Sequence, residues 1–299
     1  MEMLQLKYFQ TVARLEHMTK AAEQLQIAQP SLSKTIARLE ETVGVPLFDR
    51  QGRQIRLNQF GRTFLERVDR AFRELEEGGR EIRDMAGLHR GSVKLGVSIT
   101  SVLPELIGAF VKQYPQVHFR QTLGTTSAMK RQLEEGEIDL CISSIPIISP
   151  ELEWKELMTE EIFIAVSPEH ALADRESIHL HELGQESFIS MNVGFAFRDL
   201  TDQLCSQTGF KPAITFEVDE PEGIVRLVGQ GLGIAFLPAL GLKARARHHL
   251  KRIRILNPNF YRTTGLAWSK KHYLSLAAQK FSEYLISGYE RMQDELSNG

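Results

Sequence analysis

The sequence predicts an α/β protein in which a small helical domain, a long helix and a two-lobed α/β domain follow one another. Three observations carry this prediction. In residues 1–58, apolar residues recur at helical spacing in three short segments that precede a basic hairpin. Residues 59–88 keep one apolar stripe through a charge-rich stretch, and from residue 89 strand and helix periods alternate. We therefore expect domains at 1–58, 59–88 and 89–299.

The composition is that of an ordinary globular protein. The chain has 299 residues, of which 42% are hydrophobic and 25% charged, and its net charge is −2. Residues 1–58 carry eight Lys and Arg against six Asp and Glu, whereas residues 91–299 carry 21 against 25. A nucleic-acid function would therefore depend on where the basic residues lie and not on overall basicity.

The first domain is expected to hold three helices and a hairpin. Apolar residues within 4–13 give the first helix one buried face, and Thr19 is the expected N-cap of the second. After a break at 26–29, Pro30 suits the first turn of a third helix. Its buried face recurs from Leu32 to Val43 at spacings of four, three and four, and Gly44 is expected to end it.

These residues resemble the N-terminal signature of the LysR-type transcriptional regulators. In that family a winged helix-turn-helix binds DNA, a long helix dimerises, and a two-lobed domain resembling type 2 periplasmic binding proteins binds a small effector. One departure is Ala28, because the family usually has Ser or Thr there as a helix N-cap, which is worth about 1 kcal/mol. The resemblance is carried by Lys20-Ala21-Ala22, Leu25, Gln29-Pro30-Ser31, Ser33, Ile36, Leu39-Glu40, Gly44, Leu47-Phe48 and Arg50.

The resemblance and the polar face of the third helix together place the expected DNA contacts. Gln29, Ser33 and Lys34 occupy the family's base-facing positions, and short polar or basic side chains on an exposed helix face can enter a major groove. Arginines of the hairpin, Arg56 among them, would reach phosphate or the minor groove. The alternative is a solvated helix face. The expected DNA-binding residues are Gln29, Pro30, Ser31, Ser33, Lys34, Arg38, Arg50 and Arg53.

Residues 59–87 predict one long helix with a dimerisation seam. Apolar residues alternate by four and three over three heptads between densely charged flanks. The alternative is an amphipathic helix that lies on its own domain, but the length and the charged flanks favour pairing with a second copy. The expected dimerisation residues are Phe64, Val68, Ala71, Phe72, Leu75 and Ile82.

The rest of the chain predicts two α/β lobes. Strands at 93–97, 117–123 and 138–142 alternate with helices at 103–114 and 129–135, which is typical of a parallel sheet covered by helices. The first lobe is expected at about 89–161 and 268–299, including a closing helix at 273–290. The second lobe is expected at about 162–267, so the chain would cross between the lobes twice.

Hydroxyl-bearing residues gather where strands of both lobes are expected to end. Ligands in open α/β sheets bind at the carboxyl ends of strands, and hydroxyls beside helix N-termini suit a carboxylate or another small anion. A plain N-cap role explains some single residues equally well, so the cluster is the stronger signal. The expected effector-binding residues are Ser98, Thr100, Ser101, Thr125, Thr126, Ser127, Ser143, Met191, Asn192 and Gly194.

Several other patterns are interpreted as structural. The basic run Lys243–Arg254 is interpreted as a solvated surface, and a contact to DNA or to an anion is the less favoured alternative. Gly229–Gly233 follows a helix and precedes a strand, the reverse of a dinucleotide loop. The histidines at 179, 181, 248 and 249 lack a third ligand at workable spacing, so no metal is expected. Cys141 is interpreted as core and Cys205 as more open, without a disulfide or a redox pair.

The sequence therefore predicts a sequence-specific DNA-binding regulator that is controlled by a small carboxylate or amino acid. An activator is favoured over a repressor. Its expected partners are promoter DNA, the effector and itself as homodimer or homotetramer, with RNA polymerase as a candidate. The absence of an apolar N-terminal region and of a membrane-length run predicts the cytoplasm. The rival is a small-molecule binding module or enzyme whose N-terminal helices serve protein interaction only. No nucleophile elbow, P-loop or HExxH motif is present, so neither catalysis nor a cofactor is expected.

Overall fold

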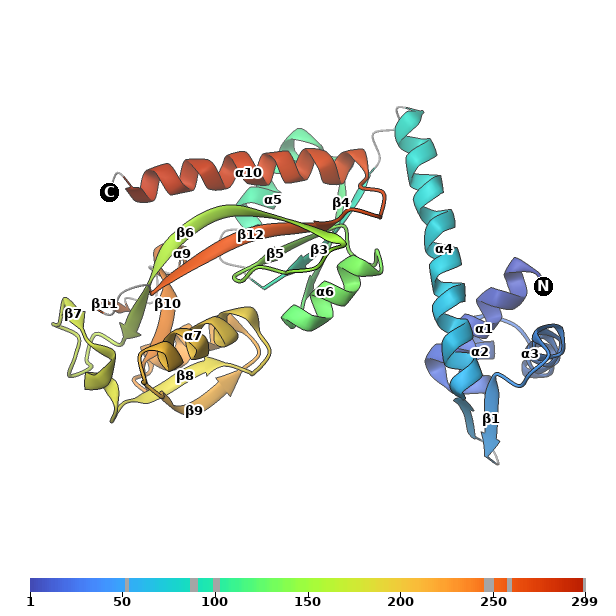
Figure 1. Cartoon of the computed structure of the whole chain (residues 1–299), viewed down its shortest axis with the longest axis horizontal. Helices are drawn as coiled ribbons and strands as arrows, with labels where there is room; N and C mark the ends of the chain where they lie inside the picture. The colour runs from blue at the N-terminus through green and yellow to red at the C-terminus, as the bar shows by residue number, and fades with distance from the viewer. Residues whose placement is uncertain (52–53, 87–90, 99–102, 245–249, 257–259, 298–299) are drawn as a thin grey trace. The chain divides into compact units, whose positions relative to one another are not determined.

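The computed structural model describes residues 1–51, 54–86, 91–98, 103–244, 250–256 and 260–297 (Figure 1). The chain forms two compact units, Met1–Arg80 and Glu81–Gly299. The long helix α4 (Gln59–Met85) belongs to both. The domain limits expected at residues 58 and 88 stay predictions. None of the described helices is long and apolar enough to cross a membrane.

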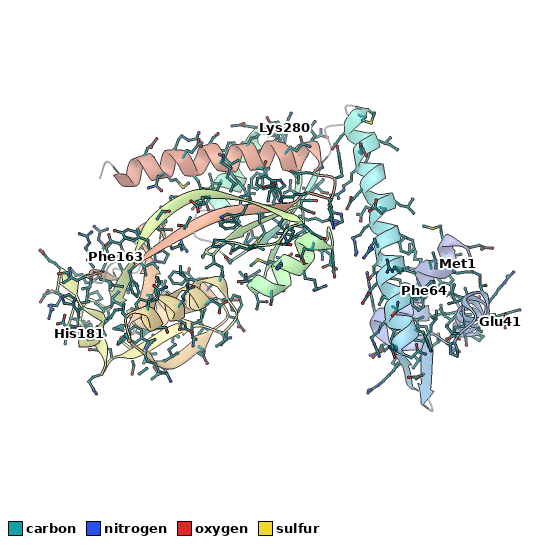
Figure 2. All side chains as sticks on the ribbon, in the orientation of Figure 1. Met1, Glu41, Phe64, Phe163, His181 and Lys280 are labelled. Atoms are coloured by element: carbon teal, nitrogen blue, oxygen red, sulfur yellow. The ribbon has the colours of Figure 1, made fainter. Side chains whose placement is uncertain are left out.

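The N-terminal unit packs three helices, a hairpin and the first half of α4 around one apolar core. Leu32, Ile36 and Leu39 of the third helix are fully buried there. The ring of Phe9 contacts those of Phe48 and Phe64, and Figure 2 marks Phe64 where α4 meets this core. The elements are α1 (Met3–Leu15), α2 (Met18–Gln24), α3 (Gln29–Val43), β1 (Phe48–Gln51) and β2 (Gln54–Leu57).

The helix ends agree with the sequence in two places and differ in one. Ala28 precedes α3 without a side-chain hydrogen bond, and Gly44 ends that helix with a φ of +88°. The expected N-cap at Thr19 is wrong. His17 takes that role, because its side chain accepts a hydrogen bond from the Lys20 N–H and Thr19 already lies inside α2.

The apolar seam of α4 is divided between two environments. Val68 is buried in the core of the N-terminal unit, and Phe64 and Phe72 pack against that core. Leu75 and Ile82, further along, are 60% and 68% exposed. The first half of α4 therefore lies on its own domain, as the alternative interpretation expected. Leu75 and Ile82 of the second half remain exposed and could pack against a second copy of the chain.

The C-terminal unit is built on one eight-stranded sheet with the order β4-β3-β5-β12-β6-β11-β7 and β10 beside β6. Its first lobe has the predicted β-α-β-α-β order, and β3, β4 and β5 pair in parallel. The helices α5, α6 and α10 belong to this lobe. Its elements are β3 (Ser92–Val97), α5 (Leu103–Gln113), β4 (His118–Leu123), α6 (Thr126–Glu134), β5 (Leu140–Ser143) and α10 (Leu276–Ser297).

Two long antiparallel strands, β6 (Leu152–Val166) and β12 (Tyr261–Ser269), run through both lobes side by side (Figure 1). The second lobe is expected to begin at residue 162, whereas the strand that enters it, β6, starts ten positions earlier, at Leu152. The first part of β6 was not predicted, because several charged residues interrupt the apolar pattern there. The lobes are thus two ends of one continuous sheet.

The second lobe adds a small parallel sheet of β8 and β9 to the far end of the large one. Its elements are β7 (Ser177–Ile178), a 3-10 turn (Leu180–Leu183), β8 (Ser187–Met191), α7 (Ala196–Gln207), β9 (Ala213–Val218), α8 (Pro221–Gly229), β10 (Ala235–Pro238), α9 (Ala239–Ala244) and β11 (Lys251–Ile255).

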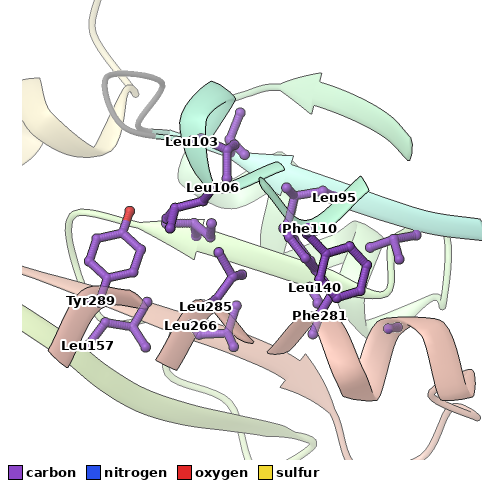
Figure 3. Packing of buried hydrophobic residues seen from close by; sticks show 14 of the residues in the cluster. Leu95, Leu103, Leu106, Phe110, Leu140, Leu157, Leu266, Phe281, Leu285 and Tyr289 are labelled. Carbon is purple, nitrogen blue, oxygen red and sulfur yellow. The ribbon is translucent and has the colours of Figure 1, made fainter. Parts of the chain in front are cut away.

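The core of the first lobe lies between its sheet and the helices α5 and α10 (Figure 3). Phe110 of α5 meets Phe281 of α10 edge to face, with ring centroids 5.0 Å apart. Leu95, Leu140 and Leu266 supply the strand side of this core. Such burial is the main favourable contribution to folding, and it holds the strand ends of this lobe in fixed places.

A buried ion pair joins the two crossing strands. Glu160 of β6 accepts a hydrogen bond from the Arg262 Nε of β12 at 3.0 Å and another from the Leu240 N–H at 2.6 Å. The guanidinium of Arg262 also lies over the ring of Phe197 in the second lobe. One charged pair therefore links both crossing strands to α7 and α9 at the place where the lobes meet.

Candidate nucleic-acid interface and effector site

The polar face of α3 is exposed over a fully buried opposite face. Gln29, Pro30, Ser31, Lys34 and Arg38 are exposed, and Ser33 is half-buried. Ser31, Lys34 and Arg38 fall at spacings of three and four, which puts them on one side of the helix. The arrangement can lay a short polar and basic ridge into a groove of DNA.

The hairpin is tied to α3 by one carboxylate. Glu40 accepts hydrogen bonds from the backbone N–H groups of Leu47 at 2.7 Å and Phe48 at 3.2 Å. Arg56 is exposed on β2, opposite Asp49. The side chain of Arg50 and all of Arg53 lie outside the described residues. Glu40 therefore joins α3 to the start of the hairpin.

In the first lobe, the serines that follow β3 and β5 meet at the carboxyl ends of these strands. The Ser98 Oγ accepts a hydrogen bond from the Ser144 N–H at 3.1 Å, and the Ser98 N–H donates to the Ile142 carbonyl at 2.9 Å. Ser144 is 2% exposed, and its Oγ is buried without a hydrogen-bond partner among the described residues. A buried hydroxyl of this kind calls for an explanation, and a polar ligand atom supplies one.

The N-terminus of α6 lies at the same edge of the sheet. Thr125 is its N-cap and accepts a hydrogen bond from the Ala128 N–H at 3.3 Å. Ser127 is exposed, and its Oγ lies 3.3 Å from the Thr125 Oγ1. The Thr126 Oγ1 is a second buried hydroxyl that has no partner in the described part of the chain. Hydroxyls and backbone N–H groups at a helix N-terminus suit an anion.

The second lobe faces this edge with the loop after β8. The Asn192 side chain donates to Asp219, and the Gly194 N–H donates to Asp199 at 3.3 Å. Gly194 has a φ of +92°, which favours glycine. The Gly194 carbonyl accepts a hydrogen bond from the Thr126 N–H at 3.2 Å, so the lobes touch directly at α6.

Arg198 of α7 holds the start of the loop after β8 in place. Its guanidinium donates to the Met191 carbonyl at 2.9 Å, to Glu217 at 2.7 Å and to Asp202 at 2.7 Å. Burial alone would lower the pKa of Arg198, but the hydrogen bonds to Glu217 and Asp202 raise it, so the group stays charged. The sequence analysis missed Arg198 and Asp219, because no spacing in the sequence links them to the loop.

The structure brings together only part of the expected effector set. Ser98, Thr125, Thr126, Ser127, Asn192 and Gly194 lie at the facing edges of the two lobes. Ser143 is fully buried and its Oγ accepts a hydrogen bond from the Ile145 N–H, while the Met191 side chain packs in an apolar core. Thr100 and Ser101 lie outside the described residues.

Both cysteines are free and buried. Burial raises the pKa of the Cys141 thiol well above its ordinary range, and burial together with Asp202 raises the pKa of Cys205 to about 12. The expectation that Cys205 is more open is wrong, since it is 1% exposed and packs in the core of the second lobe. No group of three His, Cys, Asp or Glu able to hold a metal occurs among the described residues.

Comparison with known proteins covers nearly the whole chain. Residues 3–62 match the model described as bacterial regulatory helix-turn-helix protein, lysR family, and residues 86–289 match the LysR substrate binding domain. The chain is 42% identical to the HTH-type transcriptional regulator YybE of Bacillus subtilis (strain 168), over 97% of this chain and 99% of YybE. It is 33% identical to the transcriptional dual regulator GltC of the same organism, over 98% of this chain and 99% of GltC.

A solved structure shows the same fold. Full-length CbnR in complex with its target DNA superposes with a TM-score of 0.72 over 95% of this chain and 99% of CbnR, at 24% identity. The winged helix-turn-helix and the two-lobed α/β domain of this chain therefore carry the sequence signatures and the architecture of one family. The chain belongs to the LysR family of DNA-binding transcriptional regulators, which join a helix-turn-helix to an effector-binding domain.

Proposed function

We propose that this regulator reads DNA through α3 and the hairpin, with a division of labour between them. The observation that carries the proposal is the exposed row Ser31, Lys34 and Arg38 beside Gln29, over a fully buried opposite face. Gln29, Ser33 and Lys34 contact base edges, and Ser31, Arg38, Arg50 and Arg53 contact phosphate or the minor groove.

A nuclease footprint on the DNA upstream of the chain's own gene, taken over a range of salt, tests this proposal. We expect two protected half-sites separated by whole helical turns. Arg53→Ala should weaken binding to all sequences and reduce the salt slope by about one, whereas Gln29→Ala should change the base preference. Lys112→Ala, an exposed lysine of the C-terminal unit, is the matched control. Equal losses at every base for both variants would refute the division.

The effector binds between the two lobes, and its class is a small carboxylate or an amino acid. The support is a pair of buried hydroxyls, Thr126 and Ser144, that have no partner among the described residues and lie beside Ser98 and the N-terminus of α6. Asn192 and Gly194 close the site from the second lobe. Calorimetry with candidate carboxylates and amino acids tests this placement. Thr126→Ala and Ser98→Ala should weaken binding, and Ser282→Ala at a half-buried position of α10 should not. Unchanged affinity in both site variants would exclude the placement.

The active form is a homodimer or homotetramer joined through α4. Exposed Leu75 and Ile82 lie seven residues apart on that helix, which is the spacing of a coiled-coil seam. Leu75→Glu should reduce the assembly size measured by sedimentation, and Glu74→Gln should leave it unchanged. Activation of a neighbouring promoter is the expected regulatory outcome, and RNA polymerase is the expected partner. The expected location is the cytoplasm. The relative GltC is named a dual regulator, which supports activation as one of two regulatory outcomes.

A further inference from the structure

The Asp84 carboxylate connects the last turn of α4 to Tyr273 and to the start of α10. The Asp84 Oδ2 accepts hydrogen bonds from the Tyr273 hydroxyl at 2.9 Å and from the Leu276 N–H at 2.8 Å. Leu276 is the first residue of α10, so Asp84 satisfies an N–H that this helix cannot satisfy itself. A carboxylate at a helix N-terminus is also electrostatically favourable. Any movement of Tyr273 or of the start of α10 therefore acts on α4.

Tyr273 directly follows a residue that lies against α6. The His272 Nε2 donates to the Glu134 carbonyl, the last of α6, at 2.9 Å. Gly136, just past that helix, has a φ of +67°, and a Cβ there would lie 2.7 Å from the His272 Nδ1. The imidazole thus fills the place where a side chain at residue 136 would stand. The C-terminal end of α6 and Asp84 meet on two adjacent residues of one short segment.

The other end of α6 lies at the edge proposed to hold the effector. Thr125 caps it, and the Thr126 N–H reaches the Gly194 carbonyl of the second lobe. The helix is only nine residues long, and its Met129 and Leu133 are buried in an apolar core. A helix of this length spans roughly 13 Å and moves as one body, because its backbone hydrogen bonds keep its length fixed.

We propose that α6 transmits occupancy of the effector site to the long helix through His272, Tyr273 and Asp84. An anion at the N-terminal turn competes with the Gly194 carbonyl for the Thr126 N–H and shifts α6. His272 follows the C-terminal turn, and the Tyr273–Asp84 hydrogen bond re-aims the last turn of α4, which leads to the DNA-binding unit. Asp84 and Tyr273 are thus positioning residues for regulation. This inference rests on the proposed function, since it takes the start of α6 as part of the effector site.

A tethered charge tests this route without a known effector. Ser127→Cys places an exposed thiol on the first turn of α6, while the native Cys141 and Cys205 are buried. Alkylation with iodoacetate then adds a carboxylate at that turn, and alkylation with iodoacetamide adds a neutral group of nearly the same size. The Kd of each form for the footprinted DNA is measured by fluorescence anisotropy. We expect the two forms to differ by about fivefold or more, the lower end of typical coupling between sites.

The same pair of modified proteins is then made in three backgrounds. In Asp84→Ala the two Kd values should converge, and Tyr273→Phe, which keeps the ring and removes one hydroxyl, should shrink the difference as well. Glu81→Ala removes an exposed carboxylate from the same helix and should leave the difference intact. A purely structural role of Asp84 would lower stability but leave the ratio of the two Kd values unchanged. If Asp84→Ala does not fold, Tyr273→Phe carries the test alone.

The outcomes separate this inference from the proposed function. Equal Kd values for the two modified forms in the otherwise native chain would overturn the route through α6. A difference that survives both Asp84→Ala and Tyr273→Phe would overturn the role of these residues. In either case the unmodified chain still binds its DNA, and the proposed function stands. Loss of DNA binding by the unmodified chain would instead remove the proposed function, and the inference with it.

Discussion

Removal of the Glu40 carboxylate should detach the hairpin from α3. In Glu40→Ala, the backbone N–H groups of Leu47 and Phe48 lose the acceptor that now lies at 2.7 and 3.2 Å. Leu47 is fully buried, so its N–H group depends on this carboxylate for a hydrogen-bond acceptor. The hairpin would then lose its fixed position beside the DNA-reading face.

The size of the effect follows from these two distances. A hydrogen bond to a charged group contributes about 1.5–3 kcal/mol to stability, and a buried donor left without an acceptor costs a similar amount. With both bonds taken near the bottom of that range, because both are only partly buried, the loss is about 3 kcal/mol for the N-terminal unit. Glu40→Gln keeps one acceptor oxygen and should cost about 1 kcal/mol.

Hydrogen exchange read by mass spectrometry measures this loss locally. The amides of residues 47–48 should exchange about a hundredfold faster in Glu40→Ala, as expected for nearly 3 kcal/mol. DNA affinity should fall in parallel. Both tryptophans, Trp154 and Trp268, lie in the C-terminal unit, so the unfolding midpoint read by their fluorescence should not move. Native-like exchange at residues 47–48 in Glu40→Ala would refute the reasoning.

Three further outcomes follow from the structure. Ala28→Ser supplies the N-cap that α3 lacks and should stabilise that helix by about 1 kcal/mol, seen as about fivefold slower exchange of its first amides. Glu160→Gln or Arg262→Met should each cost about 3–5 kcal/mol in urea unfolding, because one buried charge loses its partner, and the double replacement with methionine should cost less than either. Iodoacetamide should leave Cys141 and Cys205 unmodified between about pH 7 and 9 until urea unfolds the chain, because the pKa values of both thiols are raised in the fold. The raised pKa values also make the free energy of unfolding depend on pH. The thiols favour the folded state fully below the pKa of the unfolded thiol, and this preference falls as the pH rises above that value.

Local features of the fold could be predicted because neighbours in the sequence determine them. The buried face of α3, its end at Gly44 and the missing cap at Ala28 depend on spacings of four residues or fewer. The cap of α2 shows the limit, since His17 and Thr19 are both able to cap and only the backbone decides between them. The order β3, α5, β4, α6, β5 was also predictable, because each element is a continuous segment with its own period.

Features made by distant residues could not be predicted. The strand β6 pairs with β12 from about a hundred residues away, and its charged first part became a strand only because that partner completes the ladder. Glu160 and Arg262 are buried on these two strands, although charged residues are expected at the surface. Arg198 and Asp219 joined the candidate site for the same reason. No pattern along the sequence carries such pairings.

The hydroxyls of the effector site show how far residue type alone can go. Ser143 and Ser144 are adjacent, both follow from the same rule about strand ends, and both are buried. Ser143 is the last residue of β5, whereas Ser144 lies just past the end of the strand, so the two serines have different surroundings. The Ser143 Oγ accepts the Ile145 N–H within a tight turn, while the Ser144 Oγ has no partner in the described structure and its N–H is bonded to Ser98. The sequence could therefore identify the strand end where these hydroxyls gather, and only the structure shows which of them lacks a hydrogen-bond partner among the described residues.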